Sequence, residues 1–396
     1  MKINILFFFT SLLLYSNLSA QREVLTWYDE AHQLKKEKYH EKKTGDTLIK
    51  DGLYEIYYQN GQLWQRGNYK NGKLEGAWII NHDNGKIKEK VNFKEDKLEG
   101  PSETYYTDGQ IYQIANYKKD VFEGERKIFY EDGQLMEVAH FKDGLLEGEA
   151  LGYHANGKPH YKKNYRANLE EGYTETYYEN GNILERLYKH KGLNDSLFIS
   201  YDKDIAGAKT NECFYSNGFI EGPFVSYYTN GNIKLKCNYV SGKIEGNYEA
   251  YFDNNMPKEK GQYVHGKKTG EWNSYYITGE LYIKGSYLND KYEGTWLVYR
   301  PNGKLKQEGD YKNGLSEGVW SFYDENGKLQ RKGNYIHNEQ EGIWETYYES
   351  GKVKIEQNYS RGKLNGICKS FTEDGKLLEQ VEFMNGVEVK VGPYKR

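Results

Sequence analysis

The chain has 396 residues, a formal net charge of −3 and a mean hydropathy of −0.94, with 43 glycines and 40 tyrosines but only six prolines. The near-neutral charge gives no general basic field for nucleic acid, and the low hydropathy excludes a protein with many membrane spans. The bias towards glycine and tyrosine points to internal repetition.

Residues 1–20 have the pattern of a secretory signal peptide. Lys2 precedes the apolar run INILFFFTSLLL, and small polar residues end the segment before Gln21. The alternative, an anchor helix, is disfavoured because the run is shorter than the roughly 20 residues of a membrane span. We therefore expect export, with a mature chain that is periplasmic or extracellular and has no transmembrane segment.

Residues 21–51 are expected to form an N-terminal cap or linker. Trp27 and Tyr39 keep the spacing found between Tyr57 and Tyr69, which indicates a degenerate hairpin over residues 26–40. The alternative is an unstructured charged linker. At the other end, residues 390–396 are expected to be a closing strand or a tail, because open sheet edges invite pairing.

The chain between these ends repeats every 24 residues. One series of glycines begins at Gly52 and a second at Gly61. Taking the first series as position 0, we count 14 units over residues 52–389: six over 52–195, one degenerate widened unit over 196–221, and seven over 222–389. An N-G, D-G or T-G pair at positions 8 and 9 predicts a two-residue type I′ turn, so each unit is expected to be a β-hairpin.

Such a hairpin pairs residues whose positions sum to 17. Large residues at position 2 then meet glycines at position 15 in five units, although Trp78 meets Val91 and Trp344 meets Gln357. Strand alternation places positions 0, 2, 4, 6, 11, 15 and 17 on an apolar face. The wetter face carries position 5, which is aromatic in 13 of the 14 units.

Stacked hairpins predict an all-β fold, an elongated single-layer antiparallel sheet like a solenoid ribbon. The unit YYxNGxLxxxGxYxxGxxxGxWxxY resembles the MORN repeat, in the bacterial variant found in YwqK-like antitoxins, and the resemblance covers residues 52–389. It implies a groove for peptide or helical segments of partner proteins, as in eukaryotic relatives. It also implies a structural role, and no catalytic one, for the recurring Gly, Tyr and Trp.

The wetter face carries a candidate partner-binding strip. Position 14 is basic in eight units, and lysines at position 12 are expected to oppose the tyrosine column at position 5. Tyrosines and cations together suit an acidic peptide, an anionic glycan or lipid head groups, whereas the alternative is that lysine stems merely cover the rings. The candidate residues are Tyr227, Tyr251, Tyr275, Tyr299, Lys234, Lys236, Lys258, Lys260 and Lys284.

One segment imitates a calcium loop. Asp202, Asp204 and Gly207 match its first, third and sixth positions, but Ala206 replaces a ligand and Glu212 comes one residue early. The sequence therefore favours a widened hairpin turn over a metal site.

Other candidate sites are also weak. His154 and His160, at positions 6 and 12, are expected to face opposite sides of the sheet and to share no metal. The glutamates before the position-0 glycines are expected about 9.6 Å apart, too far for a paired-carboxylate site. Cys213 and Cys237, equally separated, lie beyond the roughly 7 Å limit for a disulfide and are expected to be free thiols packed against phenylalanines. We predict no catalytic residue, metal or cofactor, and hence no enzyme.

The predicted function is a non-catalytic, extracytoplasmic protein–protein interaction module or scaffold that uses the aromatic and basic strip. One alternative is a ribbon that binds a glycan or an anionic envelope surface. Another is an immunity protein that, like an antitoxin, neutralises a toxin partner, in this case a secreted or periplasmic one. Nucleic acid is not an expected partner.

Overall fold

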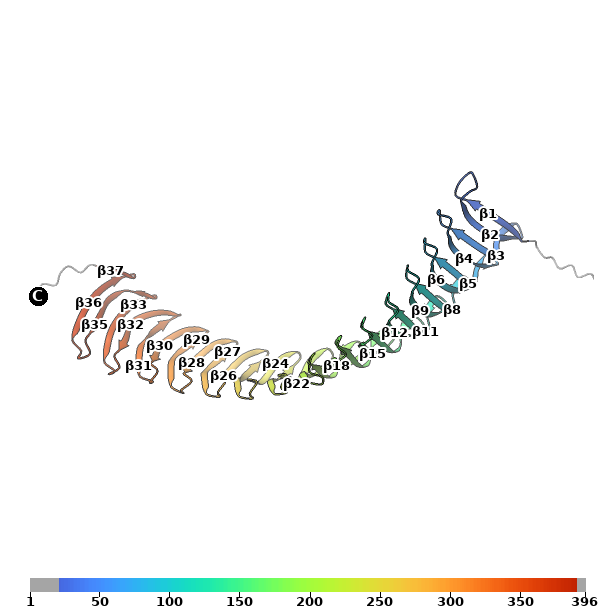
Figure 1. Cartoon of the computed structure of the whole chain (residues 1–396). Coiled ribbons are helices and arrows are strands. Elements are labelled where there is room, and N and C mark those ends of the chain that lie inside the picture. The colour runs from blue at the N-terminus through green and yellow to red at the C-terminus, as the bar shows by residue number, and fades with distance from the viewer. Residues whose placement is uncertain (1–20, 390–396) are drawn as a thin grey trace, which may run out of the picture. The chain divides into compact units, whose positions relative to one another are not determined.

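The computed structural model describes residues 21–389 (Figure 1). The predicted signal peptide and the predicted closing strand lie outside these residues. All regular structure in the described part of the chain is β, and no helix there is long and apolar enough to cross a membrane. The chain divides into two compact units, one up to Glu170 and one from Glu171.

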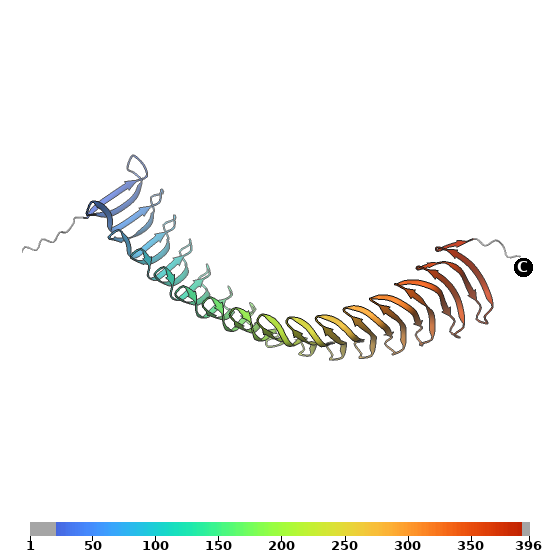
Figure 2. The ribbon, with the colours of Figure 1, turned by 180° about the vertical axis from the view of Figure 1, so that it is seen from behind.

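In the first unit the strands follow one another in chain order, and strands that pair with each other are antiparallel (Figure 2). Residues 22–41 form a hairpin of β1 and β2, which precedes the regular repeats. The strands of this unit are β1 (Arg22–Trp27), β2 (Lys35–Thr44), β3 (Thr47–Tyr57), β4 (Leu63–Lys70), β5 (Lys73–Asn81), β6 (Ile87–Lys94), β7 (Lys97–Leu98), β8 (Gly100–Tyr105), β9 (Ile111–Lys118), β10 (Val121–Phe122), β11 (Gly124–Phe129), β12 (Leu135–Lys142), β13 (Leu145–Leu146), β14 (Gly148–Tyr153), β15 (Pro159–Arg166) and β16 (Leu169–Glu170).

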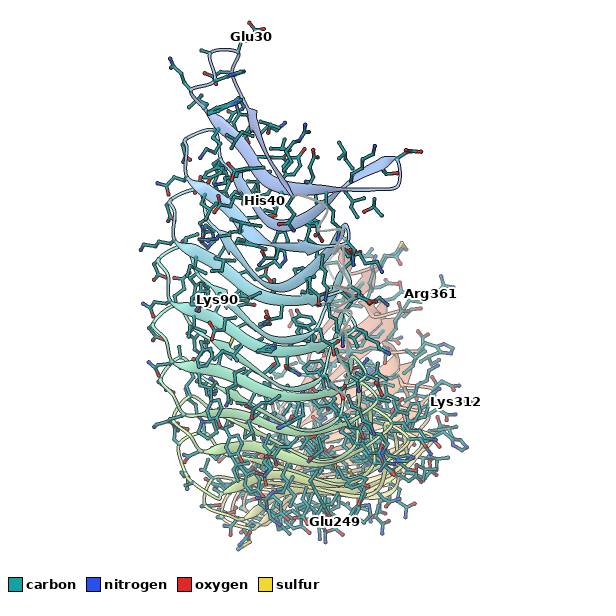
Figure 3. The ribbon with its side chains drawn as sticks, turned by 90° about the vertical axis from the view of Figure 1, so that its right-hand side faces the viewer. Glu30, His40, Lys90, Glu249, Lys312 and Arg361 are labelled. Atoms are coloured by element: carbon teal, nitrogen blue, oxygen red, sulfur yellow. The ribbon has the colours of Figure 1, made fainter. Side chains whose placement is uncertain are left out.

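The second unit has the same arrangement. Its strands are β17 (Gly172–Tyr177), β18 (Ile183–His190), β19 (Leu193–Asn194), β20 (Ser196–Tyr201), β21 (Lys209–Ser216), β22 (Phe219–Tyr227), β23 (Ile233–Val240), β24 (Lys243–Tyr251), β25 (Pro257–Val264), β26 (Lys267–Tyr275), β27 (Leu281–Leu288), β28 (Lys291–Tyr299), β29 (Leu305–Lys312), β30 (Leu315–Tyr323), β31 (Leu329–Ile336), β32 (Glu339–Tyr347), β33 (Val353–Ser360), β34 (Lys363–Leu364), β35 (Gly366–Phe371), β36 (Leu377–Met384) and β37 (Val387–Val389). Side chains stand on both surfaces of the strands (Figure 3). The predicted all-β, single-layer antiparallel fold is confirmed within each unit.

The tight turns lie at positions 19 and 20, where each hairpin joins the next. Asn71 and Gly72 have φ values of 53° and 79°, and the flanking residues Lys70 and Lys73 pair with each other. Positive φ at both central residues is the type I′ geometry. The same geometry recurs at later junctions, even where the pair is Lys119–Asp120.

The prediction of a type I′ turn at positions 8 and 9 is therefore wrong. Residues 58–62 form a wider loop, closed by a 2.8 Å hydrogen bond from the Tyr58 amide to the Gln62 carbonyl, in which only Gly61 has positive φ. The Asn60 side chain accepts a hydrogen bond from the Gln62 amide at 3.0 Å. This local bond stabilises the wider loop, as asparagine commonly does in turns.

The predicted register is nevertheless confirmed at positions 0 to 4. Gly52 pairs with Tyr69 and Tyr54 pairs with Gly67, as positions summing to 17 require. The two pairs that fitted poorly, Trp78–Val91 and Trp344–Gln357, also occur. A bulge between positions 4 and 5 then shifts the pairing at the loop end of each hairpin.

Each glycine at position 15 lies beneath a tryptophan of the following hairpin, not of its own. A Cβ placed on Gly67 would lie 2.1 Å from Cδ2 of Trp78. The tryptophan follows the glycine by 11 residues in every such contact. The other contacts of this kind are Gly261–Trp272, Gly285–Trp296, Gly309–Trp320 and Gly333–Trp344. The poor fit of Trp78 with Val91 thus disappears, because Trp78 covers Gly67 and needs no small residue directly opposite.

The core is formed by these large side chains and their neighbours. Tyr54, Trp78 and Val91 are buried together, with Tyr69 and Phe93 packed against them. We call the surface that carries positions 2 and 15 the tryptophan face. Positions 3, 5 and 14 form the opposite surface, which we call the tyrosine face.

Candidate functional site

Tyrosine and asparagine side chains of the repeated motif form hydrogen bonds from one hairpin to the next. The Tyr58 hydroxyl, at position 6, donates a 2.8 Å hydrogen bond to the Asn81 carbonyl in the following unit, and the Asn60 amide donates to the Asp83 carbonyl at 2.9 Å. The tyrosine bond recurs from Tyr106, Tyr130, Tyr178, Tyr228, Tyr276 and Tyr348. These tyrosines and asparagines therefore hold neighbouring hairpins in register.

The glutamates at position 23 have a structural role that the sequence analysis did not find. The carboxylate of Glu245 accepts a 2.6 Å hydrogen bond from the His265 amide, the first residue of the next type I′ turn. The same contact links Glu75 to Glu95 and Glu317 to His337. Hydrogen bonds of this kind stabilise a turn that needs positive φ at non-glycine residues.

On the tyrosine face, position 5 belongs to a network of paired charges. Lys236 forms a 2.9 Å ion pair with Glu249, and Glu249 also accepts a hydrogen bond from the Tyr251 hydroxyl. The tyrosine bond and then Lys236 lower the pKa of Glu249, whereas burial raises the pKa of Tyr251. Because glutamates pair with Lys236 and Lys284, the strip is aromatic and partly charge-paired rather than simply basic.

The four candidate tyrosines occupy equivalent places in the second unit, since each is the last residue of a strand. Tyr227 ends β22, Tyr251 ends β24, Tyr275 ends β26 and Tyr299 ends β28. Like Lys236, Lys284 is paired, in its case with Glu271 at 2.9 Å.

The expected contact of the position-12 lysines with this tyrosine column is wrong. Lys234 Nζ lies 5.8 Å from the ring centroid of Tyr228, and Lys258 Nζ lies 5.9 Å from that of Phe252. Both rings are at position 6. The wider loop and the bulge at its base bring positions 6 and 12 together, so these lysines cover the loop instead of the strip.

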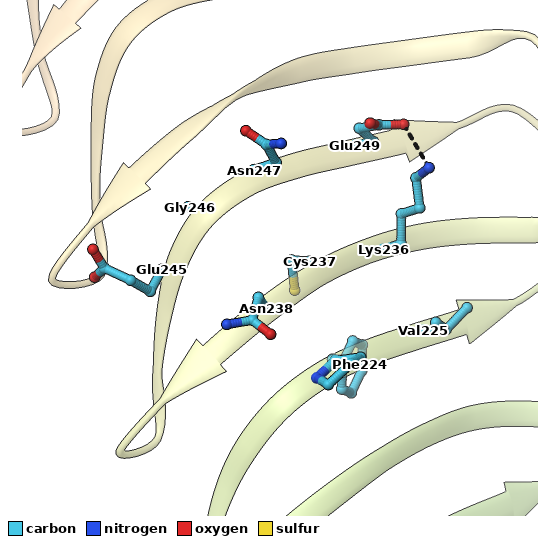
Figure 4. A pocket seen from close by; sticks show the side chains of 10 residues that line it. Phe224, Val225, Lys236, Cys237, Asn238, Glu245, Gly246, Asn247 and Glu249 are labelled. Carbon is cyan, nitrogen blue, oxygen red and sulfur yellow. Dashed lines mark ion pairs between the residues drawn. The ribbon is translucent and has the colours of Figure 1, made fainter.

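A hollow of about 610 Å³ opens on the tyrosine face beside Lys236 (Figure 4). Asn238 and Asn247 line it from neighbouring strands, and the Lys236–Glu249 ion pair stands at its side. A second hollow, of about 480 Å³, shares Asn247 and Glu249 with the first. The two therefore adjoin and form a groove across β22–β26, and each by itself is within the size range of ligand sites.

These hollows are equivalent places in successive repeats. The second is lined by Lys260 and Gln262, at the same positions as Lys236 and Asn238. A smaller one in the first unit, of about 320 Å³, is lined at these positions by Lys90 and Asn92. Each lies where two strands separate at a bulge near position 15. The recurrent amide at position 16 was the signal in the sequence.

The structure contradicts the expected separation of His154 and His160. Their ring centroids lie 4.4 Å apart, with an angle of 35° between the ring planes. Like Tyr106 and Tyr112, they occupy positions 6 and 12, which the wider loop brings into contact. Burial, followed by His154 and Lys163, lowers the pKa of His160.

The segment that imitates a calcium loop is a widened hairpin loop. Asp202 Oδ1 accepts hydrogen bonds from the Asp204 and Ile205 amides, and Glu212 pairs with Lys209 at 2.6 Å. The loop spans residues 202–208, between the paired residues Tyr201 and Lys209. Within residues 21–389 no three His, Cys, Asp or Glu side chains gather as a metal site.

Cys213 and Cys237 are free, as predicted, and so is Cys368. Cys213 pairs in the sheet with Phe198 on one side and Phe224 on the other, and Phe224 in turn pairs with Cys237. Burial raises the pKa of both buried thiols to about 11, which makes them poor nucleophiles at neutral pH.

The hairpin array with its recurrent surface hollows defines a repeat-based binding module. The chain belongs to the MORN repeat variant family, whose model matches it in repeated segments that together cover more than half of its length. The matched segments are residues 50–71, 74–95, 98–119, 122–143, 146–167, 170–190, 220–241, 292–313, 316–337, 340–361 and 364–385.

Solved structures show only distant likeness. The crystal structure of TcdB2-TccC3-Cdc42 is 12% identical at a TM-score of 0.15, with 90% of this chain and 24% of that chain covered. The structure of the Tc holotoxin pore of Photorhabdus luminescens is 12% identical at a TM-score of 0.15, with 91% of this chain and 24% of that chain covered. A porin-like protein from Bacteroides uniformis is 10% identical at a TM-score of 0.13, with 75% of this chain and 91% of that chain covered. This chain thus spans about a quarter of the first two, and scores this low support no functional argument. No curated protein matches.

Proposed function

We propose that the protein is a non-catalytic interaction module, exported from the cytoplasm, that holds an extended segment of a protein partner on its tyrosine face. The observation that carries this proposal is the row of equivalent hollows across β22–β26, which share residues from one repeat to the next. The signal-peptide pattern of residues 1–20 supports export.

The chemistry of the groove suits a polypeptide. Asn238, Asn247, Gln262 and Asn273 bring amide groups that can both donate and accept hydrogen bonds, as a peptide backbone requires. Hairpins advance about 9.6 Å per unit and an extended chain about 3.3 Å per residue, so about three partner residues would lie over each repeat. Tyrosines beside the groove supply anchoring surface.

Charge pairing disfavours the alternative of an anionic glycan or envelope surface. Such ligands bind arrays of unpaired cations, whereas Lys236 and Lys284 already pair with Glu249 and Glu271. The resemblance to YwqK-like antitoxins makes a secreted or periplasmic toxin one candidate partner of the same kind.

Substitution of Tyr227, Tyr251 and Tyr275 by alanine is expected to abolish capture of a protein partner by the mature chain from an envelope fraction. Truncating aromatic residues at an interface centre typically costs about 2 kcal/mol or more each in binding. Capture would be measured by pull-down, with the recovered protein identified and its binding repeated with purified components.

The matched control replaces Tyr57, Tyr105 and Tyr153, which occupy the same position in the first unit. We expect this variant to retain capture, and circular dichroism should show the same fold in both. Capture that survives the Tyr227, Tyr251 and Tyr275 substitutions would contradict the proposal. Loss of capture after glycan-degrading treatment of the envelope fraction would instead favour the glycan-binding alternative.

A further inference from the structure

The unit at residues 148–171 carries an imidazole pair where other repeats carry larger aromatic rings. Positions 6 and 12 hold Tyr58 with Trp64, and Tyr276 with Tyr282, whose ring centroids are 5.6 and 4.8 Å apart. His154 and His160 stand at 4.4 Å. A contact between two aromatic rings at these positions packs against the loop, but only a pair of histidines can also bind a metal ion.

Both histidines are held in place by the backbone. His154 follows the last residue of β14, and its amide donates a 2.8 Å hydrogen bond to the Lys158 carbonyl across the loop. His160 is the second residue of β15, directly after Pro159, which pairs with Tyr153 in the sheet. The two side chains therefore meet without any rearrangement of the backbone, which reduces the entropy that a ligand must overcome on binding.

Their separation matches that of two imidazoles on one metal ion. A metal–nitrogen bond of about 2.0–2.1 Å, extended by about 1.1 Å to the ring centre, puts the centroids of two adjacent ligands on the order of 4.5 Å apart when the bonds are at right angles. The two ring planes are inclined at 35° to each other. His160 is exposed, so water can complete the coordination.

We propose that His154 and His160 form a surface site for one late first-row divalent ion, with two imidazole nitrogens and water as ligands. Neutral imidazole favours copper, nickel and zinc, and the order of affinities places Cu²⁺ highest. Mg²⁺ and Ca²⁺ prefer oxygen ligands and are expected not to bind there. The site lies in the first unit, and it does not depend on the groove across β22–β26.

The test is titration of the full chain with Cu²⁺, followed by electron paramagnetic resonance. One site is expected to fill first, with hyperfine splitting from two equivalent imidazole nitrogens. The double variant H154Y/H160Y, which installs the tyrosine pair of Tyr106 and Tyr112, should lose this site and weaken the tightest Cu²⁺ binding by more than about tenfold.

The matched control is H82Y, because His82 occupies position 6 in a unit whose position 12 is Lys88. This variant should keep the first Cu²⁺ site. Nuclear magnetic resonance adds a readout on the unchanged protein, since Cu²⁺ should broaden the signals of His154 and His160 before those of other histidines. A first site that persists in H154Y/H160Y, or broadening that begins elsewhere, would overturn the proposal.

Discussion

Replacing Gly333 by alanine is expected to unfold the hairpins around β31–β33, at a cost of about 3–5 kcal/mol, close to that of removing a buried tryptophan. The new Cβ would lie 2.0 Å from Cδ2 of Trp344, which is only 1% exposed. The indole cannot move aside, because Tyr335 packs edge-on at 5.0 Å and Arg331 covers its ring at 4.6 Å. Hydrogen exchange of the β31–β33 amides should report the loss locally, as repeat arrays unfold in parts.

The double variant of Gly333→Ala with Trp344→Ala separates a steric clash from a general effect on the strand. It reproduces the pair Ala139 and Ala150, which occupies the same two positions in the first unit and is buried there. We expect it to be no less stable than Trp344→Ala alone, which gives a coupling energy above about 2 kcal/mol. Additive losses in the double variant would show that the glycine has another role.

The spacing of Gly333 and Trp344 also shows how far sequence reasoning reaches. The repeat, the hairpins and their register follow from periodicity, because strand alternation and pairing are strictly local rules. Contacts between successive hairpins do not follow from the register within one. The sequence nevertheless held the signal, since each tryptophan at position 2 comes 11 residues after a glycine.

The positions of the tight turns were the second feature that could not be predicted from the sequence. An asparagine–glycine pair is the strongest short hairpin signal, yet Asn60 and Gly61 lie in a wider loop and the type I′ turns lie at pairs such as Lys119–Asp120. There the neighbouring unit stabilises the strained turn through a glutamate, a contact that local propensity does not contain. This error in the turn placed His154 and His160 on opposite faces and hid their contact.

The groove could be predicted only in part. Its tyrosines and lysines were identified from their period, but the hollow beside Lys236 arises from a bulge that separates β23 from β24. Bulges depend on how a glycine with positive φ, such as Gly246, is accommodated between two strands. The ion pairs of Lys236 and Lys284 could not be predicted by counting basic positions either, because they depend on which glutamate lies beside each lysine.

Alkaline unfolding is the other large effect that we expect. Burial, followed by hydrogen bonds to Glu55, Glu175 and Glu345, raises the pKa of Tyr57, Tyr177 and Tyr347 to about 12. In the unfolded chain tyrosine ionises near pH 10, so above that pH the unfolded state releases protons first and the free energy of unfolding falls. This stability is complete below pH 10 and is lost towards pH 12. Circular dichroism and tyrosinate absorbance should therefore change together in a steep transition.

Lysines contribute in the same direction, because their carboxylate partners raise the pKa of Lys236 and Lys209. Replacing Tyr57, Tyr177 and Tyr347 by phenylalanine removes these three phenols and leaves the lysines unchanged. At pH 7 this variant should be slightly less stable, by about 0.5–1.5 kcal/mol for each lost hydrogen bond and less where the site is exposed. Between pH 10 and 12 its stability should fall less steeply, so that the two proteins converge or cross. An unchanged slope would show that these three phenols do not cause the alkaline transition, because other partly buried tyrosines, such as Tyr263 and Tyr248, keep their raised pKa in the variant.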